Sequence, residues 1–177
     1  TLELPKGNPD LLRFAVSPNG SRFAFFTDEG IAVRDSGQRE YRVLPGTQLG
    51  ESPAFSPDGE WIIFQVRGRL RKIAASGGSA VALIPGDSVL SGDASWGHDG
   101  TIVFEARGGL YLLTPGSTVP RRLAGVEGAL APRLTLDGRG VLYLDQSRGA
   151  RLKYHDLAKD SSYTVMEDAA NGQLLSN

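Results

Sequence analysis

The sequence predicts an all-β protein built from four repeats of about 40 residues, each with four antiparallel strands. Three observations lead to this prediction. An Asn-Gly or Asp-Gly turn dipeptide recurs at spacings of 39, 41 and 38 residues, and the aromatic residue of the apolar run behind it recurs at spacings of 39, 40 and 39. Glycine accounts for 23 of 177 residues, about twice its average usage, so turns must be frequent. A period near 40 with four strands per repeat is typical of a β-propeller blade.

The first strand of each repeat is expected directly before the turn dipeptide. These short segments are 14–17, 54–56, 94–97 and 133–135. The dipeptides that follow them are Asn19-Gly20, Asp58-Gly59, Asp99-Gly100 and Asp137-Gly138. Asn, Asp and Gly tolerate the positive φ that tight hairpin turns need, so each dipeptide predicts a hairpin to the next strand.

The second strand of each repeat is apolar almost without interruption. The four runs are 23–26, 61–64, 102–104 and 141–144. Their aromatic members are Phe25, Phe64, Phe104 and Tyr143. A continuous apolar run predicts a strand that is covered on both faces, as in stacked blades.

The third and fourth strands repeat in the same phase. The third begins at Ile31, Leu70, Leu110 and Leu152, and the fourth is marked by Val43, Leu83, Leu123 and Val165. We therefore expect one propeller domain over 1–177, with blades at roughly 14–46, 53–86, 93–125 and 131–166. A β-sandwich with accidental spacing is the alternative, and four features in phase favour the propeller.

The two ends of the chain leave the closure of the propeller open. Leu4-Pro5 lies 40 residues before Leu44-Pro45, so 1–5 reads as a fourth strand without its first three. In the first alternative this is an orphan strand beside four complete blades, in a partial or open propeller cut from a longer one. In the second it forms the outer strand of the last blade and closes a four-bladed ring, and 160–177 is a tail. The tail 167–177 has no period, and a short helix, a disordered end and a segment that orders on a partner are all compatible with it. Because the chain starts at Thr1, we expect a mature or excised piece.

Composition excludes several classes of protein. A net charge of −1 and a pI near 6.1 argue against nucleic-acid binding. The basic run 67–72 is divided between two faces by strand alternation, so a solvated strand is preferred to a nucleic-acid or lipid patch. We expect no membrane span, because no stretch has roughly 18 consecutive apolar residues. The absence of cysteine excludes disulfides and thiolate metal sites.

The segments Ser17-Pro18-Asn19-Gly20 and Ser56-Pro57-Asp58-Gly59, each before an apolar strand, resemble the repeats of TolB-like β-propellers. The stretches 51–64 and 93–104 are most similar to the propeller domains fused to bacterial Ser/Thr kinases, which follow a membrane span and lie outside the cytoplasm. The third and fourth repeats depart from the pattern, with Gly97-His98 and Thr135-Leu136 in place of Ser-Pro. The resemblance implies a propeller fold and a periplasmic or otherwise extracytoplasmic location, and it selects no single function.

Motifs for chemistry are missing from the sequence. Of the two histidines, His98 occupies a turn, and His155 is followed by Asp156, which alternation places on the opposite face of a strand. There is no Gly-x-Ser-x-Gly elbow, no metal-ligand spacing and no phosphate loop. We therefore expect no catalytic residue, no metal and no cofactor, and predict that the protein is not an enzyme.

The candidate binding residues lie on one rim, where the turns between second and third strands meet the long loops to the next blade. Arginine-glycine pairs occupy three of these turns, and the loops are 46–52, 86–93 and 125–130. The candidates are Arg67, Arg107, Arg148, Glu51, Asp93, Glu127, Leu49, Leu90 and Leu130. The arginines would orient a protein or peptide and the leucines would supply desolvated contact. The alternative is that the charges only pair with each other, for less than about 1 kcal/mol.

The function expected from these observations is protein binding without catalysis. The protein would be an accessory or structural subunit of a larger, membrane-bound extracytoplasmic assembly, touching a protein partner through the rim, the unpaired strand or the tail. The alternative is a domain that senses a ligand or peptide for a bacterial kinase or transport system.

Overall fold

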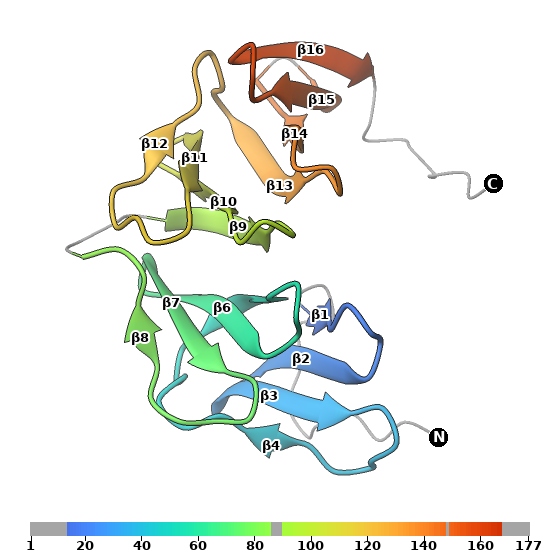
Figure 1. Cartoon of the computed structure of the whole chain (residues 1–177), viewed down its shortest axis with the longest axis vertical. Coiled ribbons are helices and arrows are strands. Elements are labelled where there is room, and N and C mark those ends of the chain that lie inside the picture. Colours follow the sequence, from blue (N-terminus) through green and yellow to red (C-terminus); the bar gives the residue numbers. More distant parts are fainter. Residues whose placement is uncertain (1–13, 86–89, 148, 168–177) are drawn as a thin grey trace. The chain divides into compact units, whose positions relative to one another are not determined.

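The computed structural model describes residues 14–85, 90–147 and 149–167. Within these ranges the chain forms sixteen strands and no helix, and the strands make four antiparallel sheets of four (Figure 1). The predicted all-β fold of four-stranded blades is confirmed. In each sheet the strands lie side by side in the order of the sequence, so that every neighbouring pair is a hairpin.

The strand bounds follow the repeat. The first sheet contains β1 (Phe14–Val16), β2 (Arg22–Thr27), β3 (Gly30–Asp35) and β4 (Arg42–Val43). The second contains β5 (Glu51–Phe55), β6 (Trp61–Val66), β7 (Arg69–Ala74) and β8 (Val81–Ala82). The third contains β9 (Leu90–Trp96), β10 (Ile102–Ala106), β11 (Gly109–Leu113) and β12 (Arg121–Arg122). The fourth contains β13 (Ala129–Leu134), β14 (Gly140–Asp145), β15 (Arg151–Asp156) and β16 (Ser161–Met166).

Three first strands start earlier than the sequence predicts. β5, β9 and β13 begin at Glu51, Leu90 and Ala129 instead of near 54, 94 and 133. In β5 and β13 the register with the next strand shifts, between Glu51 and Ala54 in β5, which is the irregularity of a β-bulge. The bulge lets the strand continue beyond the regular alternation on which the prediction depended.

The last blade has its own outer strand. β16 spans six residues and pairs with β15 from Asp156 to Leu152. The alternative in which 160–177 is a tail is therefore wrong for Ser161–Met166, because these residues complete a fourth sheet. The expected strand at 1–5 and nearly all of the expected tail lie outside the described residues.

The chain divides into two compact units, Thr1–Leu90 and Ser91–Asn177. The first unit holds the first two sheets, and the second unit holds the last two. Each unit has its own buried core, and each is described by itself below.

The core of the first unit lies between its two sheets. The buried side chains that meet there include Ala24, Ile31, Val33 and Leu44 from the first sheet and Ile62, Phe64 and Ile73 from the second. We call the face of a sheet that packs against the following sheet its forward face, and the face that packs against the preceding sheet its rear face. Thus Ala24 lies on the forward face of the first sheet and Phe64 on the rear face of the second.

The core of the second unit is built in the same way. Its buried side chains include Val103, Leu110, Leu112 and Leu123 from the third sheet and Val141 and Tyr143 from the fourth. Val103 lies at the position of Ala24 in the repeat, and Tyr143 at that of Phe64. Phe64 and Tyr143, the aromatic residues predicted for the second strands of these two sheets, are thus rear-face residues.

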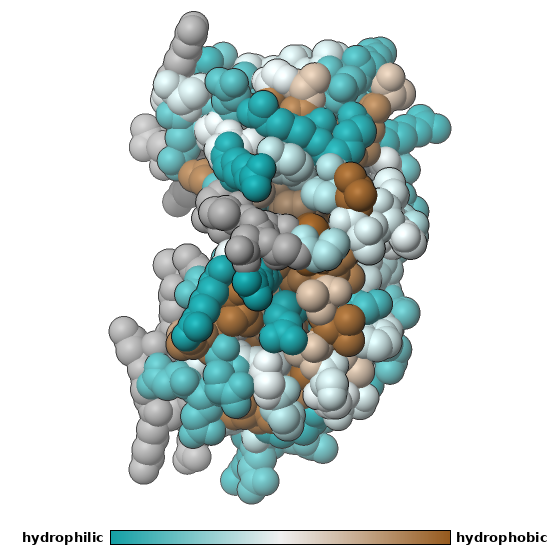
Figure 2. Space-filling model, turned by 90° about the vertical axis from the view of Figure 1, so that its left-hand side faces the viewer, coloured by the Kyte–Doolittle hydropathy of each residue, from teal (hydrophilic) through white to brown (hydrophobic). Residues whose placement is uncertain are grey.

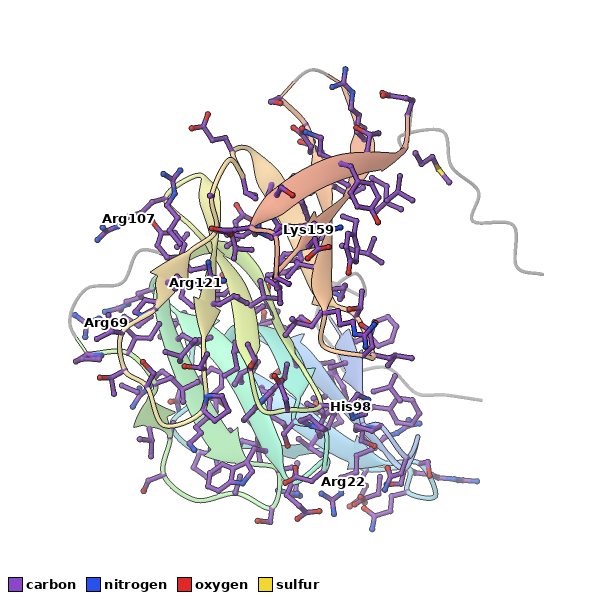
Figure 3. All side chains as sticks on the ribbon, turned by 45° about the horizontal axis from the view of Figure 1, so that its top comes forward. Arg22, Arg69, His98, Arg107, Arg121 and Lys159 are labelled. Carbon is purple, nitrogen blue, oxygen red and sulfur yellow. The ribbon has the colours of Figure 1, made fainter. Side chains whose placement is uncertain are left out.

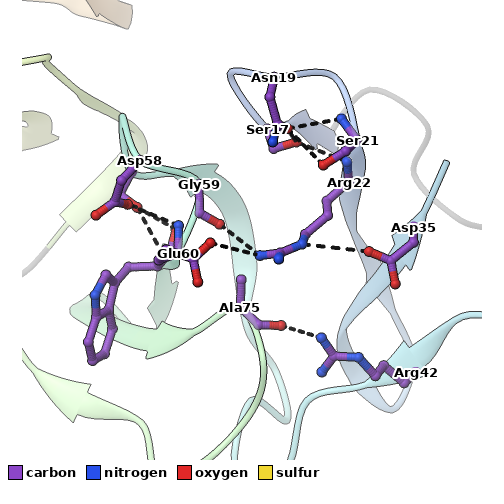
Figure 4. A network of polar contacts seen from close by, with 12 residues as sticks. Ser17, Asn19, Ser21, Arg22, Asp35, Arg42, Asp58, Gly59, Glu60 and Ala75 are labelled. Atoms are coloured by element: carbon purple, nitrogen blue, oxygen red, sulfur yellow. Dashed lines mark hydrogen bonds and ion pairs between the residues drawn. The ribbon is translucent and has the colours of Figure 1, made fainter.

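Arginines tie the first sheet to the second at the rim opposite the candidate site (Figure 4). Arg22 donates to the carbonyl oxygen of Gly59 at 3.2 Å and lies 3.5 Å from Oε1 of Glu60 and 3.6 Å from Oδ1 of Asp35. Arg42 at the start of β4 donates to the carbonyl oxygen of Ala75. These contacts add directional hydrogen bonds at the margin of the apolar core.

No helix in the described part of the chain has the length and apolar character needed to cross a membrane.

Candidate functional site

The candidate rim of the first unit is formed by the β2–β3 turn, the β6–β7 turn and the connection from β4 to β5. Thr47 anchors this connection: its buried hydroxyl accepts the N–H of Ile31 at 2.9 Å and donates to the carbonyl oxygen of Leu44 at 2.6 Å. Gly50 then donates its N–H to the carbonyl oxygen of Thr47 at 2.8 Å. Because the connection is fixed at both ends, the residue between these anchors is held in one place.

That residue is Leu49, which is 54% exposed and has a left-handed backbone with φ 59°. Arg67, in the β6–β7 turn, is exposed and has φ 50°. A left-handed φ costs roughly 1 kcal/mol in a residue with a side chain. The rim of the first unit therefore presents an apolar and a cationic side chain on ordered backbone.

The rim of the second unit has the same construction. Arg107 is exposed, with φ 49°, in the β10–β11 turn, and it extends away from the ribbon in Figure 3. The N–H of Gly128 donates to the carbonyl oxygen of Gly108 at 2.9 Å, and the N–H of Gln146 donates to that of Gly128 at 3.3 Å. Glu127, next to Gly128, is exposed. The connection between the sheets thus lies between two turns and brings Glu127 to the same rim as Arg107.

Three predicted site residues lie in strands instead of rim loops, namely Asp93, Leu130 and Glu51. Two more, Leu90 and Arg148, lie partly or wholly outside the described residues. Asp93 is half-buried within β9, and Leu130 is half-buried within β13, where it pairs with Leu144. Their placement in loops was wrong, because both strands begin earlier than the repeat indicates. The backbone of Leu90 opens β9. Its side chain and the whole of Arg148 lie outside the described residues.

Glu51 is the first residue of β5, is exposed, and pairs with Gln65 across the sheet. It therefore lies at the rim end of β5 and not in the predicted loop 46–52, because β5 also begins earlier than the repeat indicates. Ser52 beside it has φ 50° and a buried hydroxyl without a hydrogen-bond partner. Ala131 has φ 49° at the equivalent position of β13. Since an alanine repeats this conformation, the left-handed backbone belongs to the bulge and does not by itself mark a site.

The basic run 67–72 is distributed as the solvated-strand interpretation predicts. Nζ of Lys72 lies 4.7 Å from the centre of the Trp61 ring, and Arg71 donates to the carbonyl oxygen of Ala80 at 2.8 Å. The face in Figure 2 mixes hydrophilic side chains with smaller apolar areas and carries no single extended patch of either kind. Lys72 and Arg71 therefore make these contacts within the second sheet.

A polar network that the sequence analysis missed is centred on His155. The imidazole is fully buried, with Nδ1 2.9 Å from Oγ of Ser162 and Nε2 3.0 Å from Oδ1 of Asp160. The hydroxyl of Tyr143 donates to Oγ of Ser162 at 3.0 Å. A carboxylate only accepts, so Nε2 donates a hydrogen bond to Asp160, while Nδ1 and Oγ of Ser162 share the second hydrogen bond of the ring. The four groups form one chain of hydrogen bonds that runs from Tyr143 to Asp160.

Asp160 also connects this network to the third sheet. Its Oδ1 lies 3.3 Å from Nη1 of Arg121 and accepts the N–H of Ala124 at 3.5 Å. The hydrogen bond from His155 is the largest cause of a lowered pKa of Asp160, and Arg121 lowers this pKa further. Arg121 and Arg42 share one repeat position, so both units use an arginine of the outer strand to reach the following sheet.

The network contains the residue types of a hydrolytic triad but not its geometry. His155 has no exposed surface, and the oxygen of Ser162 is already engaged by Tyr143 and the imidazole. A nucleophilic serine must reach a substrate carbonyl beside a hydrogen-bonded histidine. The arrangement favours a structural role.

Other chemistry-bearing groups are dispersed. His98 is an exposed turn residue, as predicted (Figure 3). Among the described residues, no group of three or more His, Cys, Asp or Glu side chains could hold a metal ion.

No protein-family model matches the chain. No curated protein matches it in sequence either. Solved structures do match its fold. TolB from Acinetobacter baumannii aligns with 90% of this chain and 44% of its own, at 18% identity and a TM-score of 0.73. A nidogen/laminin complex matches at 15% identity, 85% and 61% coverage and a TM-score of 0.71. Puromycin hydrolase matches at 16% identity, 86% and 28% coverage and a TM-score of 0.70.

The chain therefore spans less than two thirds of each of these proteins. At such identities the likeness concerns the fold alone, and the three proteins differ in what their titles describe. The four sheets, their strand order and these matches lead to one conclusion: the chain has the fold of TolB-like β-propellers.

Proposed function

We propose that this chain is a non-enzymatic, protein-binding segment of a β-propeller, in which each unit docks protein through its own rim, the first with Arg67 and the second with Arg107. The observation that supports this most directly is the pairing of exposed side chains with anchored backbone on the rim of each unit. In the first unit the exposed residues are Leu49 and Arg67, and in the second they are Arg107 and Glu127.

The chemistry of the rim suits a protein partner. An apolar side chain held by its backbone loses little conformational entropy when it is covered, and an arginine can bind carboxylates or carbonyls with two parallel hydrogen bonds. Leu49 would supply the desolvated contact, while Arg67 and Arg107 would set the orientation. Arginine is also enriched among the residues that dominate binding energy in protein interfaces.

The biological setting that we propose is an accessory role in a larger, membrane-associated assembly outside the cytoplasm. The location is supported by the resemblance of Ser56-Pro57-Asp58-Gly59 and its neighbours to extracytoplasmic propellers. The nidogen/laminin match supports the idea that a scaffold of this fold binds protein. The absence of catalysis is supported by the burial of His155 beside Ser162.

Affinity purification from gently solubilised membranes of the source, followed by mass spectrometry, tests the proposal. We expect one dominant partner at a fixed ratio with the wild type and a strongly reduced yield with the triple variant Arg67→Ala, Arg107→Ala, Arg148→Ala. The matched control is Arg39→Ala with Arg139→Ala, which removes exposed arginines from the opposite rim. Recovery of the propeller alone, or equal yields from the triple variant and the wild type, would contradict the proposal.

A further inference from the structure

The outer faces of the first and last sheets are mostly apolar and remain partly exposed, with Arg34 as a charged residue on the first and Asp156 on the last. On the first sheet, Phe14 is 59% exposed, Val16 45% and Tyr41 41%. On the last sheet, Tyr163 is 58% exposed and Met166 43%. Solvent-exposed aromatic and aliphatic groups on a sheet face mark an interaction surface when they form one patch.

The register places the first group on the rear face of the first sheet. Phe14 pairs with Phe25 and Val16 with Phe23, so these four side chains share one face. Ala24, between Phe23 and Phe25, points the other way into the core of the first unit. The ring of Tyr41 lies 5.6 Å from that of Phe25 in an edge-to-face arrangement, which extends the patch toward β4.

The register places the second group on the forward face of the last sheet. Leu142 pairs with Tyr154, and Tyr154 with Tyr163, so these three share one face. Their alternation partners Val141 and Tyr143 point into the core of the second unit. The rings of Tyr154 and Tyr163 lie 5.3 Å apart, and Met166 lies on the same side opposite Leu152.

These two exposed faces are of the same two kinds, one forward and one rear, that pack on each other inside each unit. Within a unit, a forward face with Ala24 or Val103 covers a rear face with Phe64 or Tyr143, and all four are at most 2% exposed. Leu142 occupies the repeat position of Ala24 and Val103, and Phe25 that of Phe64 and Tyr143. The first sheet has no preceding sheet among the described residues, and the last sheet has no following one.

The outer strand fits this interpretation. β4 carries Arg42 and β12 carries Arg121 on the forward face, and each arginine reaches a polar group of the next sheet. At the same position of the repeat, β16 carries Tyr163. The last sheet therefore presents an aromatic ring where the first and third sheets present an arginine and the second presents Val81. Its complement is an apolar surface, which the rear face of the first sheet supplies with Phe14, Val16 and Tyr41. Arg34 also lies on this face, with its guanidinium 5.8 Å from the centre of the Phe23 ring.

We propose that the chain associates head to tail with a second copy of itself, the forward face of the last sheet in one copy packing on the rear face of the first sheet in the other. The contact is heterologous, because the two copies contribute different surfaces. It repeats, between molecules, the apolar packing that holds together the two sheets of each unit. The rim residues Arg67 and Arg107 take no part in it, so this association and the proposed partner binding can fail independently.

Sedimentation over a wide range of protein concentration tests the proposal, with two variants that each block one face. The rear-blocked variant carries Phe14→Asp and Val16→Asp, and the forward-blocked variant carries Tyr163→Asp and Met166→Asp. We expect the wild type to reach at least twice the chain mass of 18.9 kDa, and each blocked variant alone to dissociate at a concentration at least about tenfold higher. Circular dichroism and thermal melting verify that each variant is folded.

A mixture of the two blocked variants is the decisive sample. Each retains the face that the other lacks, so the mixture must form a 1:1 heterodimer with one intact contact, although neither variant associates alone. The control is Val119→Asp with Leu136→Asp, which places charges on apolar residues that are 77% and 85% exposed in turns and must leave association unchanged. A monomeric wild type, or a mixture that stays monomeric while the wild type associates, overturns the proposal.

Discussion

Nε2 of the buried His155 lies 3.0 Å from Oδ1 of Asp160, and this carboxylate is the point at which the fourth sheet meets Arg121 of the third. Asp160 itself is left-handed, with φ 48°, in the β15–β16 turn. The turn therefore serves both the hydrogen bonding of a buried imidazole and the contact between two sheets of one unit.

Replacing Asp160 tests this role. Asp160→Ala leaves Nε2–H of His155 buried without an acceptor. It also places at positive φ an apolar residue that has a β-carbon but no polar side chain to satisfy the local backbone. We therefore expect a loss of about 2 kcal/mol in the free energy of unfolding. Asp160→Asn keeps an acceptor oxygen and tolerates the left-handed backbone, so its loss should be roughly half as large. Urea denaturation measures both values. Equal losses in the two variants would mean that the acceptor is unimportant.

Acid stability should depend on Asp145. This carboxylate is 4% exposed and 2.8 Å from Nζ of Lys153, and the hydrogen bonds from Lys153 and then from Ser147 lower its pKa from 3.8 to about 2. A lowered carboxyl pKa stabilises the folded state at pH values above the unfolded pKa, and this stabilisation is lost as the pH falls through the folded pKa.

We expect about 2 kcal/mol of stability to disappear from the wild type between roughly pH 4 and pH 2 for this reason. Asp145→Asn lacks the titrating group, so the gap in unfolding free energy between wild type and variant should narrow over that interval. Lys153→Met removes the main cause of the shift and should show the same narrowing. Chemical denaturation at stepped pH measures the gap, and profiles that stay parallel would contradict the assignment.

The left-handed turn arginines predict a gain in stability when they become glycine. Arg67 has φ 50°, and glycine adopts this conformation without the steric cost of a β-carbon, so Arg67→Gly should raise the free energy of unfolding by about 0.5–1 kcal/mol. Arg39 is an exposed arginine without a positive φ. Arg39→Gly is therefore the control, and it should be neutral or destabilising. Thermal melting of the two variants distinguishes them, and a destabilised Arg67→Gly would show that the side chain makes a compensating contact.

The repeat explains why the fold could be predicted so completely. Phe25, Phe64, Phe104 and Tyr143 occupy one register position in four sheets, and local alternation at that position is the same in every repeat. The hairpin between the first and second strands of each sheet is closed by its own Asn-Gly or Asp-Gly turn. The turn dipeptides and the apolar alternation each act within one hairpin, so both could be recognised in the sequence.

Contacts across strands were harder to predict. Alternation along one strand separates His155 from Asp156, but the partners of the imidazole come from the β15–β16 hairpin, where His155 pairs with Ser162. That pairing depends on the length of the turn that ends at Asp160. The placement of Leu130 failed for a related reason, because a bulge between Leu130 and Arg133 shifts the register in a way that periodicity does not encode.

Gly140 and Tyr154 offer a test of the forward face of the last sheet. A β-carbon on Gly140 would overlap the ring of Tyr154, which lies over this glycine. The φ of Gly140 is not positive, so the backbone itself accepts alanine. The conflict is therefore between two side chains on one face, and removing the ring should remove it.

We expect Gly140→Ala to destabilise the wild type by about 1–3 kcal/mol, because the ring of Tyr154 must leave its position. In a Tyr154→Ala background the same substitution should become stabilising by about 0.5–1 kcal/mol, since glycine within a strand costs conformational entropy. Gly37→Ala, where a β-carbon meets nothing within 4 Å, is the control and should have the same small effect in both backgrounds. A double-mutant cycle of unfolding free energies measures the coupling. If Gly140→Ala has the same effect with and without Tyr154, the ring does not rest on this glycine, and the aromatic forward face must be arranged differently.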